Sequence, residues 1–296
     1  MFCVSTRRRI TVQKGKKRKL TKRAAPSDRK IRAEALDALG DGFVEDVGRY
    51  IVPIFTDDKG APTSVGSGFL LDIGSHQVLV TAAHVLDGAK EGRSYYFYVG
   101  PGTTRAVAGN VLFSKLPASG SRLDDVVDIA VAILEGDSDE LPPFPAVGKL
   151  SLPVDRVAVQ AVPREGRHFA FVGFPATKAK VNRVVKDVRS SSYAYLSRSV
   201  GAERYPELGL DETFHIVLPF DPKKVVTLDG QPFNFPKLQG VSGAPLWELG
   251  TEVEGGRRVV GVMLEHRRTE KVLVAADIWF VLRMLADHLG LGQSPR

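Results

Sequence analysis

The sequence predicts an all-β fold of the sandwich or barrel type. From residue 50 onward, short apolar runs alternate with segments rich in Gly, Pro, Asp and Lys, as expected for short strands joined by turns. Only one clear helical pattern follows them, near the C-terminus, and no internal repeat is evident. The runs are residues 50–55 (YIVPIF), 68–73 (GFLLDI), 77–83 (QVLVTAA), 95–100 (YYFYVG), 128–134 (DIAVAIL), 168–174 (HFAFVGF), 214–220 (FHIVLPF) and 257–264 (RRVVGVML).

Residues 1–40 are predicted to form a basic flexible tail that includes one short helix. Residues 1–32 hold thirteen Lys and Arg against one acid, Asp28, which leaves −5 for the rest of a chain whose net charge is +7. Such a charge run cannot build a core and predicts a solvated tail. The alternative is an electrostatic arm in weak contact with anionic surfaces. Specific nucleic-acid recognition is not expected, because Phe2 is the only aromatic residue available for base stacking.

Two segments have the periodicity of a helix. Between Ile31 and Val47 apolar residues fall on one side, and Gly40 is expected to stop this helix. Residues 277–289 form an apolar stripe and predict a C-terminal helix. The residues of that stripe are Ile278, Val281, Leu282 and Leu285.

Composition narrows the class of protein. With 296 residues, 43% of them hydrophobic, the chain can bury one or two sizeable cores. No run of about 18 apolar residues predicts a membrane span, and the basic N-terminus lacks the apolar stretch of a secretory signal. Cys3 is the only cysteine, so no intramolecular disulfide can form. These features predict a cytoplasmic protein.

Three segments carry candidate chemistry. In the first, a Val- and Leu-rich strand runs into Thr81-Ala82-Ala83-His84, where small residues allow a tight turn and leave the imidazole at a strand end. In the second, Asp128 opens an apolar strand, a position from which a partly buried carboxylate can orient a histidine. Asp124 and Asp125 are rival acids, but both lie earlier, in a more polar stretch.

The third segment is Gly240-Val241-Ser242-Gly243-Ala244-Pro245. Glycine at 240 permits a backbone conformation that aims its N–H inward beside the N–H of Ser242. Two such donors can bind the negative oxygen of a tetrahedral intermediate, and Gly243 keeps the nucleophile accessible. A Ser-Gly pair alone is also common in turns, so the prediction depends on the ordered combination of His84, Asp128 and Ser242.

TAAHV, DIAVAIL and GVSGAP resemble the three signature blocks of trypsin-like serine peptidases, in the family's order of His, Asp and Ser. The resemblance covers residues 42–289 and is nearest to the bacterial, disulfide-free branch. It implies two six-stranded Greek-key β-barrels, residues 41–150 and 151–276, followed by the helix at 277–289. Residues 41–296 would then be one peptidase domain.

The resemblance also assigns roles. Ser242 would attack the scissile carbonyl, His84 would transfer the proton, and Asp128 would orient His84. The amides of Gly240 and Ser242 would form the oxyanion hole. A protein or peptide would be the substrate.

Some positions depart from the family pattern. Val241 stands where zymogen-type members carry an aspartate, so activation by N-terminal cleavage is not expected. Pro236 stands where trypsin itself has its pocket acid. Leu264 replaces a serine that often supports the triad aspartate. Glu265 favours a basic substrate side chain, whereas His266 and the arginines after it favour an acidic one, so the preference stays open.

The loop at residues 221–240 and the absence of metal-binding motifs bear on which functions remain possible. Residues 221–240 are predicted to be an added loop that leads to the active site, as a lid, a partner-binding loop or a plain surface insertion. No metal or cofactor is expected, because the six histidines are scattered and no HExxH, CxxC or P-loop occurs. The first hypothesis is a serine endopeptidase. The alternative is a catalytically silent peptidase-fold binding or scaffold module. An esterase of the α/β-hydrolase type is disfavoured, because its triad order is Ser, Asp, His.

Overall fold

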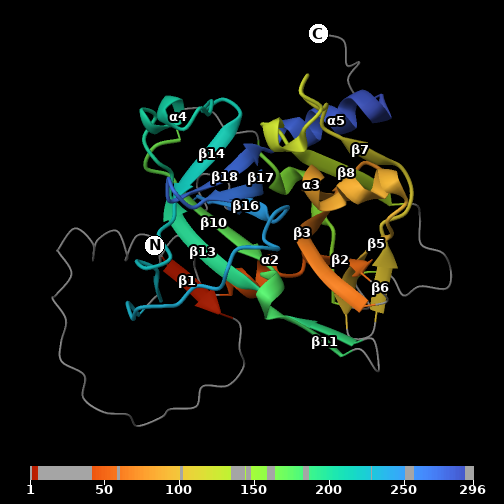
Figure 1. Cartoon of the computed structure of the whole chain (residues 1–296), viewed down its shortest axis with the longest axis horizontal. Helices are drawn as coiled ribbons and strands as arrows, with labels where there is room; N and C mark the ends of the chain where they lie inside the picture. The colour runs from red at the N-terminus through yellow and green to blue at the C-terminus, as the bar shows by residue number, and fades with distance from the viewer. Residues whose placement is uncertain are drawn as a thin grey trace.

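Two large, mainly antiparallel sheets lie side by side, with one longer helix near the C-terminus (Figure 1). The computed structural model describes residues 2–5, 42–58, 61–100, 103–134, 144, 148–158, 164–182, 187–227, 229–250 and 257–290. Each of the eight predicted apolar runs contains a strand, so the all-β prediction is confirmed.

The first sheet has the order β6-β5-β2-β3-β4-β8-β7, with β9 added in parallel beside β3. Its central strands are continuous apolar runs and are fully buried from Val78 to Val80 and from Ile129 to Ala132, as short uninterrupted runs of this kind predict. The strands are β2 (Ile51–Asp58), β3 (Ala61–Ile73), β4 (His76–Ala82), β5 (Tyr95–Gly100), β6 (Thr103–Ala106), β7 (Val111–Phe113), β8 (Ile129–Leu134) and β9 (Leu152–Pro153).

The second sheet has the order β14-β18-β17-β16-β10-β13-β1-β15. A separate hairpin joins β11 (Ala179–Asn182) to β12 (Asp187–Ser190). The strands of the sheet are β1 (Phe2–Ser5), β10 (His168–Gly173), β13 (Tyr193–Arg198), β14 (His215–Pro219), β15 (Val226–Thr227), β16 (Pro245–Leu249), β17 (Arg257–Arg267) and β18 (Val272–Asp277).

Among the described residues each sheet has eight strands, where the resemblance implied six. Three of the additional strands are short. Strands β1 and β15 extend the second sheet beyond β13, and β9 is a two-residue strand beside β3. A sheet edge presents unpaired N–H and C=O groups, so short neighbouring segments readily join it. Predicting such additions requires knowing which segments lie near an edge.

The chain passes from the first sheet to the second just beyond the predicted boundary at residue 150. Strand β9 still pairs with β3 of the first sheet, and Val157 then forms a bridge to Val259 of β17. The main hydrophobic core includes side chains from both sheets. The two sheets therefore share a core as well as a boundary.

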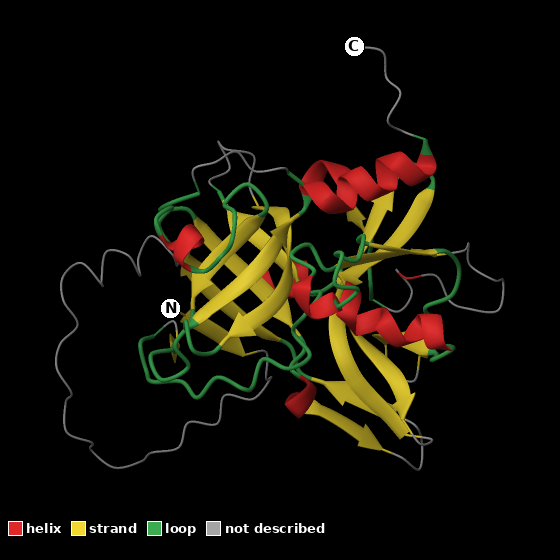
Figure 2. Ribbon diagram, turned by 45° about the horizontal axis from the view of Figure 1, so that its top comes forward, coloured by secondary structure: helices red, strands yellow, loops and turns green. Residues whose placement is uncertain are grey.

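Some of the short helical segments lie between the two sheets, whereas α4 (Arg204–Glu207) lies beside β14, away from the first sheet (Figure 1 and Figure 2). Helix α2 brings Phe43 against the fully buried Trp247 of β16, with ring centroids 6.5 Å apart. Tyr50 packs on the same indole at 6.3 Å. The short helices are α2 (Phe43–Val47), α3 (Ala83–Leu86) and α4 (Arg204–Glu207), with 3-10 turns at Asp87–Glu91, Arg122–Asp124, Val154–Arg156 and Ala176–Lys178.

The predicted C-terminal helix is confirmed as α5 (Trp279–Leu289), which begins two residues later than expected. Asp277 instead ends β18, where it pairs with Gly261, and its Oδ1 accepts the N–H of Trp279 at 2.7 Å. An aspartate in this position satisfies one of the free N–H groups of a helix start. Helix α5 then packs on β8, so the end of the second half crosses to the first sheet.

The N-terminal residues differ in part from the predicted tail. Residues 2–5 form β1, antiparallel to β13 and parallel to β15. Residues 6–41, which include most of the predicted tail and its helix, lie outside the described residues.

Candidate active site

A cleft of about 690 Å³ runs between the two halves of the protein. One side, here called the first-sheet wall, comes from residues 84–128. It consists of His84, Asp87, Arg122, Asp124, Asp125, Val126 and Asp128. The other side, the second-sheet wall, consists of Leu210, His215, Leu238, Gln239, Val241, Ser242, Met263, Leu264, Glu265, His266, Arg267, Arg268, Leu273 and Val274.

His84 and Asp128 form a two-point contact on the first-sheet wall. Strands β4 and β8 are neighbours in register, and their ends bring α3, which carries His84, beside Asp128. One oxygen of Asp128 accepts the backbone N–H of His84 at 2.9 Å. The other oxygen lies 2.5 Å from His84 Nδ1. The carboxylate therefore fixes both the position and the orientation of the imidazole.

Asp128 adopts a left-handed backbone conformation, with φ of 43°. This region is unfavourable for a residue with a Cβ, although aspartate tolerates it better than most. The side chain is nevertheless buried, at 7% exposure. Strain of this kind persists only where the surrounding contacts hold the backbone in place.

A hydrogen-bond network beneath Asp128 supplies those contacts. The Ser114 hydroxyl donates to Asp125 at 2.5 Å and accepts the N–H of Ile129 at 3.1 Å. Arg122 donates to Ser114 and forms an ion pair with Asp125. Burial by itself raises the pKa of Asp125, but these hydrogen bonds outweigh it and hold that pKa below its usual value.

The rival acid Asp125 thus belongs to the support of the loop, whereas Asp128 contacts the histidine. Asp124 lines the same wall and is exposed. The sequence had no signal for the roles of Ser114 and Arg122, because their contacts depend on how the loop folds back on itself.

The electrostatic surroundings raise the pKa of His84. Burial by itself lowers it, but the hydrogen bond to Asp128 and the charge of that carboxylate act in the opposite direction. The charges of Asp87 and Glu265 add smaller contributions, so the pKa lies above its ordinary value of 6.5. One of these two acids comes from each wall of the cleft.

Ser242 lies in a tight turn that only glycine can complete. Gly240 and Gly243 have φ values of 91° and 87°. A Cβ on Gly243 would lie 2.1 Å from Ser67 O and from Thr81 Oγ1, far inside van der Waals contact. The turn closes through the N–H of Val241, which donates to Leu238 O at 2.9 Å.

Ser67 of β3, which the sequence analysis did not single out, joins this turn to the first sheet. Its hydroxyl donates to Gly240 O at 2.7 Å and accepts the N–H of Phe174 at 3.0 Å. Its backbone N–H donates to Ser242 O at 2.9 Å, and its carbonyl accepts the hydroxyl of Thr81 at 2.7 Å. The N–H, carbonyl and hydroxyl groups of this fully buried residue thus make four hydrogen bonds, and none is left without a partner.

The backbone N–H groups of Gly240 and Ser242 have no acceptor among the described residues. Val241 is buried, and its side chain approaches Gly173 so closely that a Cβ there would lie 3.1 Å from it. Apolar packing of the Val241 side chain thus helps to hold the turn in place. Two free donors next to a hydroxyl can bind an anionic oxygen.

The candidate substrate residues are only partly brought together. Leu264, Glu265 and His266 line the second-sheet wall, and Leu264 is buried. Pro236 is not among the residues that line the cleft.

Apolar side chains of the predicted loop at 221–240 pack against the core of the second half. Phe235 is buried in the second hydrophobic cluster, with Phe233 and Leu238 against it. Of the residues of this segment that the structure describes, only Leu238 and Gln239 line the cleft.

Other kinds of site are not found in the described part of the chain. It contains no group of three or more His, Cys, Asp or Glu that could hold a metal ion. None of its helices has the length and apolar character needed to cross a membrane.

Comparison with known proteins identifies the fold. No family model matches the chain, and no curated protein matches it. Among solved structures, neuropsin, a serine protease expressed in the limbic system of mouse brain, aligns with a TM-score of 0.50 and 14% identity, over 81% of this chain and 94% of that one. The chain therefore has the chymotrypsin-like fold, mostly β with two antiparallel sheets and a C-terminal helix.

Two further structures align with lower TM-scores. The serine protease domain of the Sesbania mosaic virus polyprotein gives 0.42 at 15% identity, over 79% of this chain and 91% of that one. A thermostable serine protease from an extremophilic microorganism gives 0.48 at 16% identity, over 80% and 94%.

Proposed function

We propose that the protein is a serine endopeptidase in which His84, Asp128 and Ser242 form the catalytic triad. One observation carries the proposal: the hydrogen-bonded pair of His84 and Asp128 lines the same cleft as Ser242, and each half of the protein supplies one side of that cleft. The similarity of the fold to serine proteases is consistent with this chemistry but does not by itself establish it.

The mechanism follows from the contacts of each group. Asp128 accepts a hydrogen bond from the Nδ1–H of His84, which leaves Nε2 free to act as the base. His84 takes the proton of the Ser242 hydroxyl while Oγ bonds to the scissile carbonyl carbon. The carbonyl oxygen becomes an anion, and the N–H groups of Gly240 and Ser242 stabilise it. Losing one such donor typically costs about 10²–10³ in rate.

Collapse of the tetrahedral intermediate breaks the C–N bond and leaves an acyl-enzyme. His84 gives its proton to the departing amine. Water then attacks the acyl carbon, with the same histidine as base, and restores the Ser242 hydroxyl. The raised pKa of His84 makes it a stronger base for the two steps in which it takes a proton, first from Ser242 and then from water.

A fluorophosphonate probe tests this function, because it phosphonylates only an activated serine. The full chain is expected to label covalently, and Ser242→Ala is expected not to label. Ser197→Ala is the matched control, since Ser197 is a buried serine of β13 outside the cleft, and it should label like wild type. Equal labelling of wild type and Ser242→Ala would reject the peptidase and favour a catalytically silent binding module.

A further inference from the structure

Part of the second-sheet wall, here called the pocket, consists of Leu238, Met263, His266 and Arg268, which line the same cleft as Ser242. The turn that Val241 closes onto Leu238 keeps Leu238 beside Ser242, and the N–H of Gly243 donates to Met263 O at 2.7 Å. Farther along β17, His266 lies opposite Leu273 in register. The cleft beside Ser242 is therefore lined by the apolar side chains of Leu238 and Met263 and by His266.

His266 leaves a polar atom unsatisfied in this pocket. Its Nε2 is buried and has no hydrogen-bond partner among the described residues. The ring packs edge-on against Phe220, with centroids 5.0 Å apart, which holds it in place. A buried nitrogen without a partner costs free energy. Because His266 also lines the cleft, a ligand group that reaches Nε2 would supply the missing partner.

The charges around His266 add up to a positive site. Glu265 and Arg267 form an ion pair with each other, with Oε1 and Nε 2.6 Å apart, so their charges largely cancel. Arg268 lines the cleft and has no hydrogen-bond or ion-pair partner among the described residues. Burial, and then the charge of Arg268, lowers the pKa of His266.

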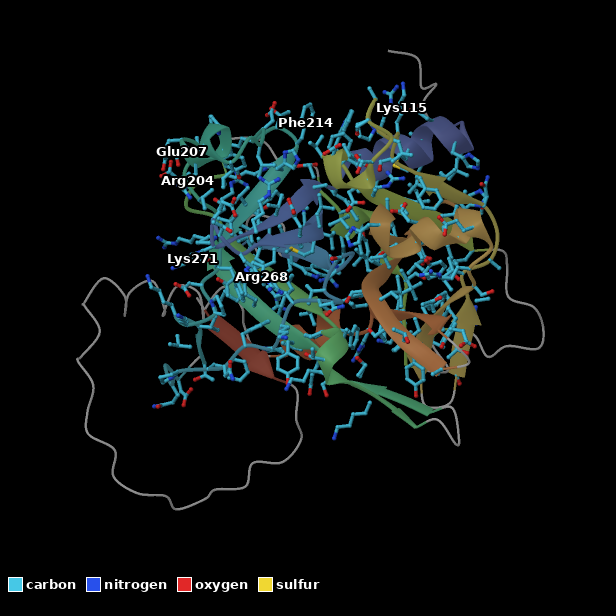
Figure 3. The ribbon with its side chains drawn as sticks, viewed as in Figure 1. Lys115, Arg204, Glu207, Phe214, Arg268 and Lys271 are labelled. Carbon is cyan, nitrogen blue, oxygen red and sulfur yellow. The ribbon has the colours of Figure 1, made fainter. Side chains whose placement is uncertain are left out.

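Apart from Glu265, which is paired with Arg267, the acids of the cleft lie on the first-sheet wall. Asp87 accepts Nε of Arg122 at 3.2 Å, Asp125 is held by Ser114 and Arg122, and Asp124 belongs to the same stretch. In Figure 3 the labelled Arg268 lies on the second-sheet side of the molecule, and Lys115 on the first-sheet side. A negatively charged group is therefore favoured near His266 rather than near His84.

Building on the peptidase function proposed above, we propose that this pocket binds a carboxylate, so that the preferred substrates carry Glu or Asp directly before the scissile bond. With its proton on Nε2, His266 donates to the carboxylate, and Arg268 supplies the opposite charge. Leu238 and Met263 contact the aliphatic stem. The unpaired Arg268 decides between the two preferences that the sequence left open.

A binding experiment tests the pocket without depending on turnover. The full-length Ser242→Ala protein is titrated with labelled peptide amides that are identical except for a C-terminal Glu, Gln or Lys, and binding is followed by fluorescence anisotropy. The Glu peptide is expected to bind about tenfold tighter than the Gln peptide, as one charge-assisted hydrogen bond implies. The Lys peptide is expected to bind weakest.

Variants locate the effect. Arg268→Gln in the same background should bring the Glu-to-Gln ratio close to one, and His266→Phe, which keeps the packing on Phe220, should also lower it. Arg283→Gln, which removes an exposed arginine of α5 outside the cleft, should keep the ratio. Equal binding of Glu and Gln peptides, tighter binding of Lys, or a ratio unchanged by Arg268→Gln would overturn the proposal.

This outcome is separable from the test of the peptidase. If the fluorophosphonate labels Ser242 but Glu is not preferred, the peptidase stands and the carboxylate pocket fails. If Glu peptides bind with the expected ratio but the probe does not label, the pocket stands as a binding site and the catalytic function fails.

Discussion

On the first-sheet wall both oxygens of Asp128 contact His84, and the Ser114 hydroxyl beneath them donates to Asp125 and accepts the N–H of Ile129. Arg122 of that wall keeps one buried nitrogen, Nη2, without a partner among the described residues. On the second-sheet wall, by contrast, the N–H groups of Gly240 and Ser242 have no partner among the described residues. Nε2 of His266 is unpaired as well. The comparison teaches that one wall is arranged in advance and the other is left open for a ligand, as pre-organised catalysis and recognition require.

The largest expected effect comes from breaking the contact that defines the first-sheet wall. Asp128→Asn keeps the shape but removes the charge and offers His84 a donor, so we expect kcat to fall by about 10⁴-fold with little change in KM. Steady-state hydrolysis of a peptide substrate measures it. Asp124→Asn, the rival acid of the same loop, should cost less than about tenfold. A larger loss from Asp124→Asn than from Asp128→Asn would reverse the assignment of the acid.

The second prediction concerns the turn that carries Ser242 and is held against the first sheet by Ser67. In Gly243→Ala the new methyl meets Ser67 and Thr81 at 2.1 Å, and φ of 87° is strained, so we expect a loss of about 3 kcal/mol or more in the free energy of unfolding. Urea denaturation at constant m-value measures it. The matched control is Gly74→Ala, which has φ of 61° but open space around it and should cost only about 1 kcal/mol. Equal losses would mean that backbone strain, not the close approach, sets the requirement.

A paired measurement sharpens the contrast between satisfied and unsatisfied groups. Ser114→Ala leaves Asp125 and the N–H of Ile129 short of a partner, so it should lower the free energy of unfolding by about 1–3 kcal/mol. His266→Phe removes an unpaired nitrogen and should be neutral or stabilising by up to about 1 kcal/mol. Denaturation midpoints of the two variants check this. Strong destabilisation by His266→Phe would show that the histidine has a structural role.

The smallest expected effect is a shift in pH dependence. The mechanism needs neutral His84, whose pKa is raised, so kcat/KM should fall on acidification through an apparent pKa above 6.5. Asp87→Asn removes one of the raising charges and should move this acid limb to lower pH. The shift should be small, because Asp87 is 41% exposed and its charge is screened by solvent. The exposed Asp287→Asn on α5 is the control and should leave the profile in place, whereas a shift to higher pH in Asp87→Asn would contradict the sign.

The strands were predictable from the sequence because apolar runs between turn residues determine them locally. The contact of His84 with Asp128 was also expected, from the ordered blocks that resemble the trypsin-like peptidases. The structure shows how it forms: β4 and β8 lie next to each other, and the two residues follow β4 and precede β8. Strands β13 and β18 were not among the eight runs predicted from the sequence. The short β1 and β9 were not predicted either, because they form only where an existing sheet edge offers partners.

The supporting residues were beyond local reasoning for a different reason. Ser67 and Gly240 lie 173 residues apart, and only the folded chain shows that one hydroxyl bonds the other's carbonyl. Likewise, the side chains of residues 265–268 include charges of both signs, so the sequence alone does not give the charge that a ligand would meet there. Their balance became clear only when Glu265 and Arg267 were seen to pair with each other, which leaves Arg268.

The position of Ser67 also limits how the protein could be recombined. This residue belongs to the first half of the chain, yet it bonds the backbone of Gly240, Ser242 and Phe174 in the second. A chimaera that takes its two halves from different homologues would have to match donor and acceptor positions across this joint, even if each half kept its own sheet. The two halves are thus not interchangeable. A hybrid that lacked these hydrogen bonds could still form both sheets, but the turn that carries Ser242 would be distorted.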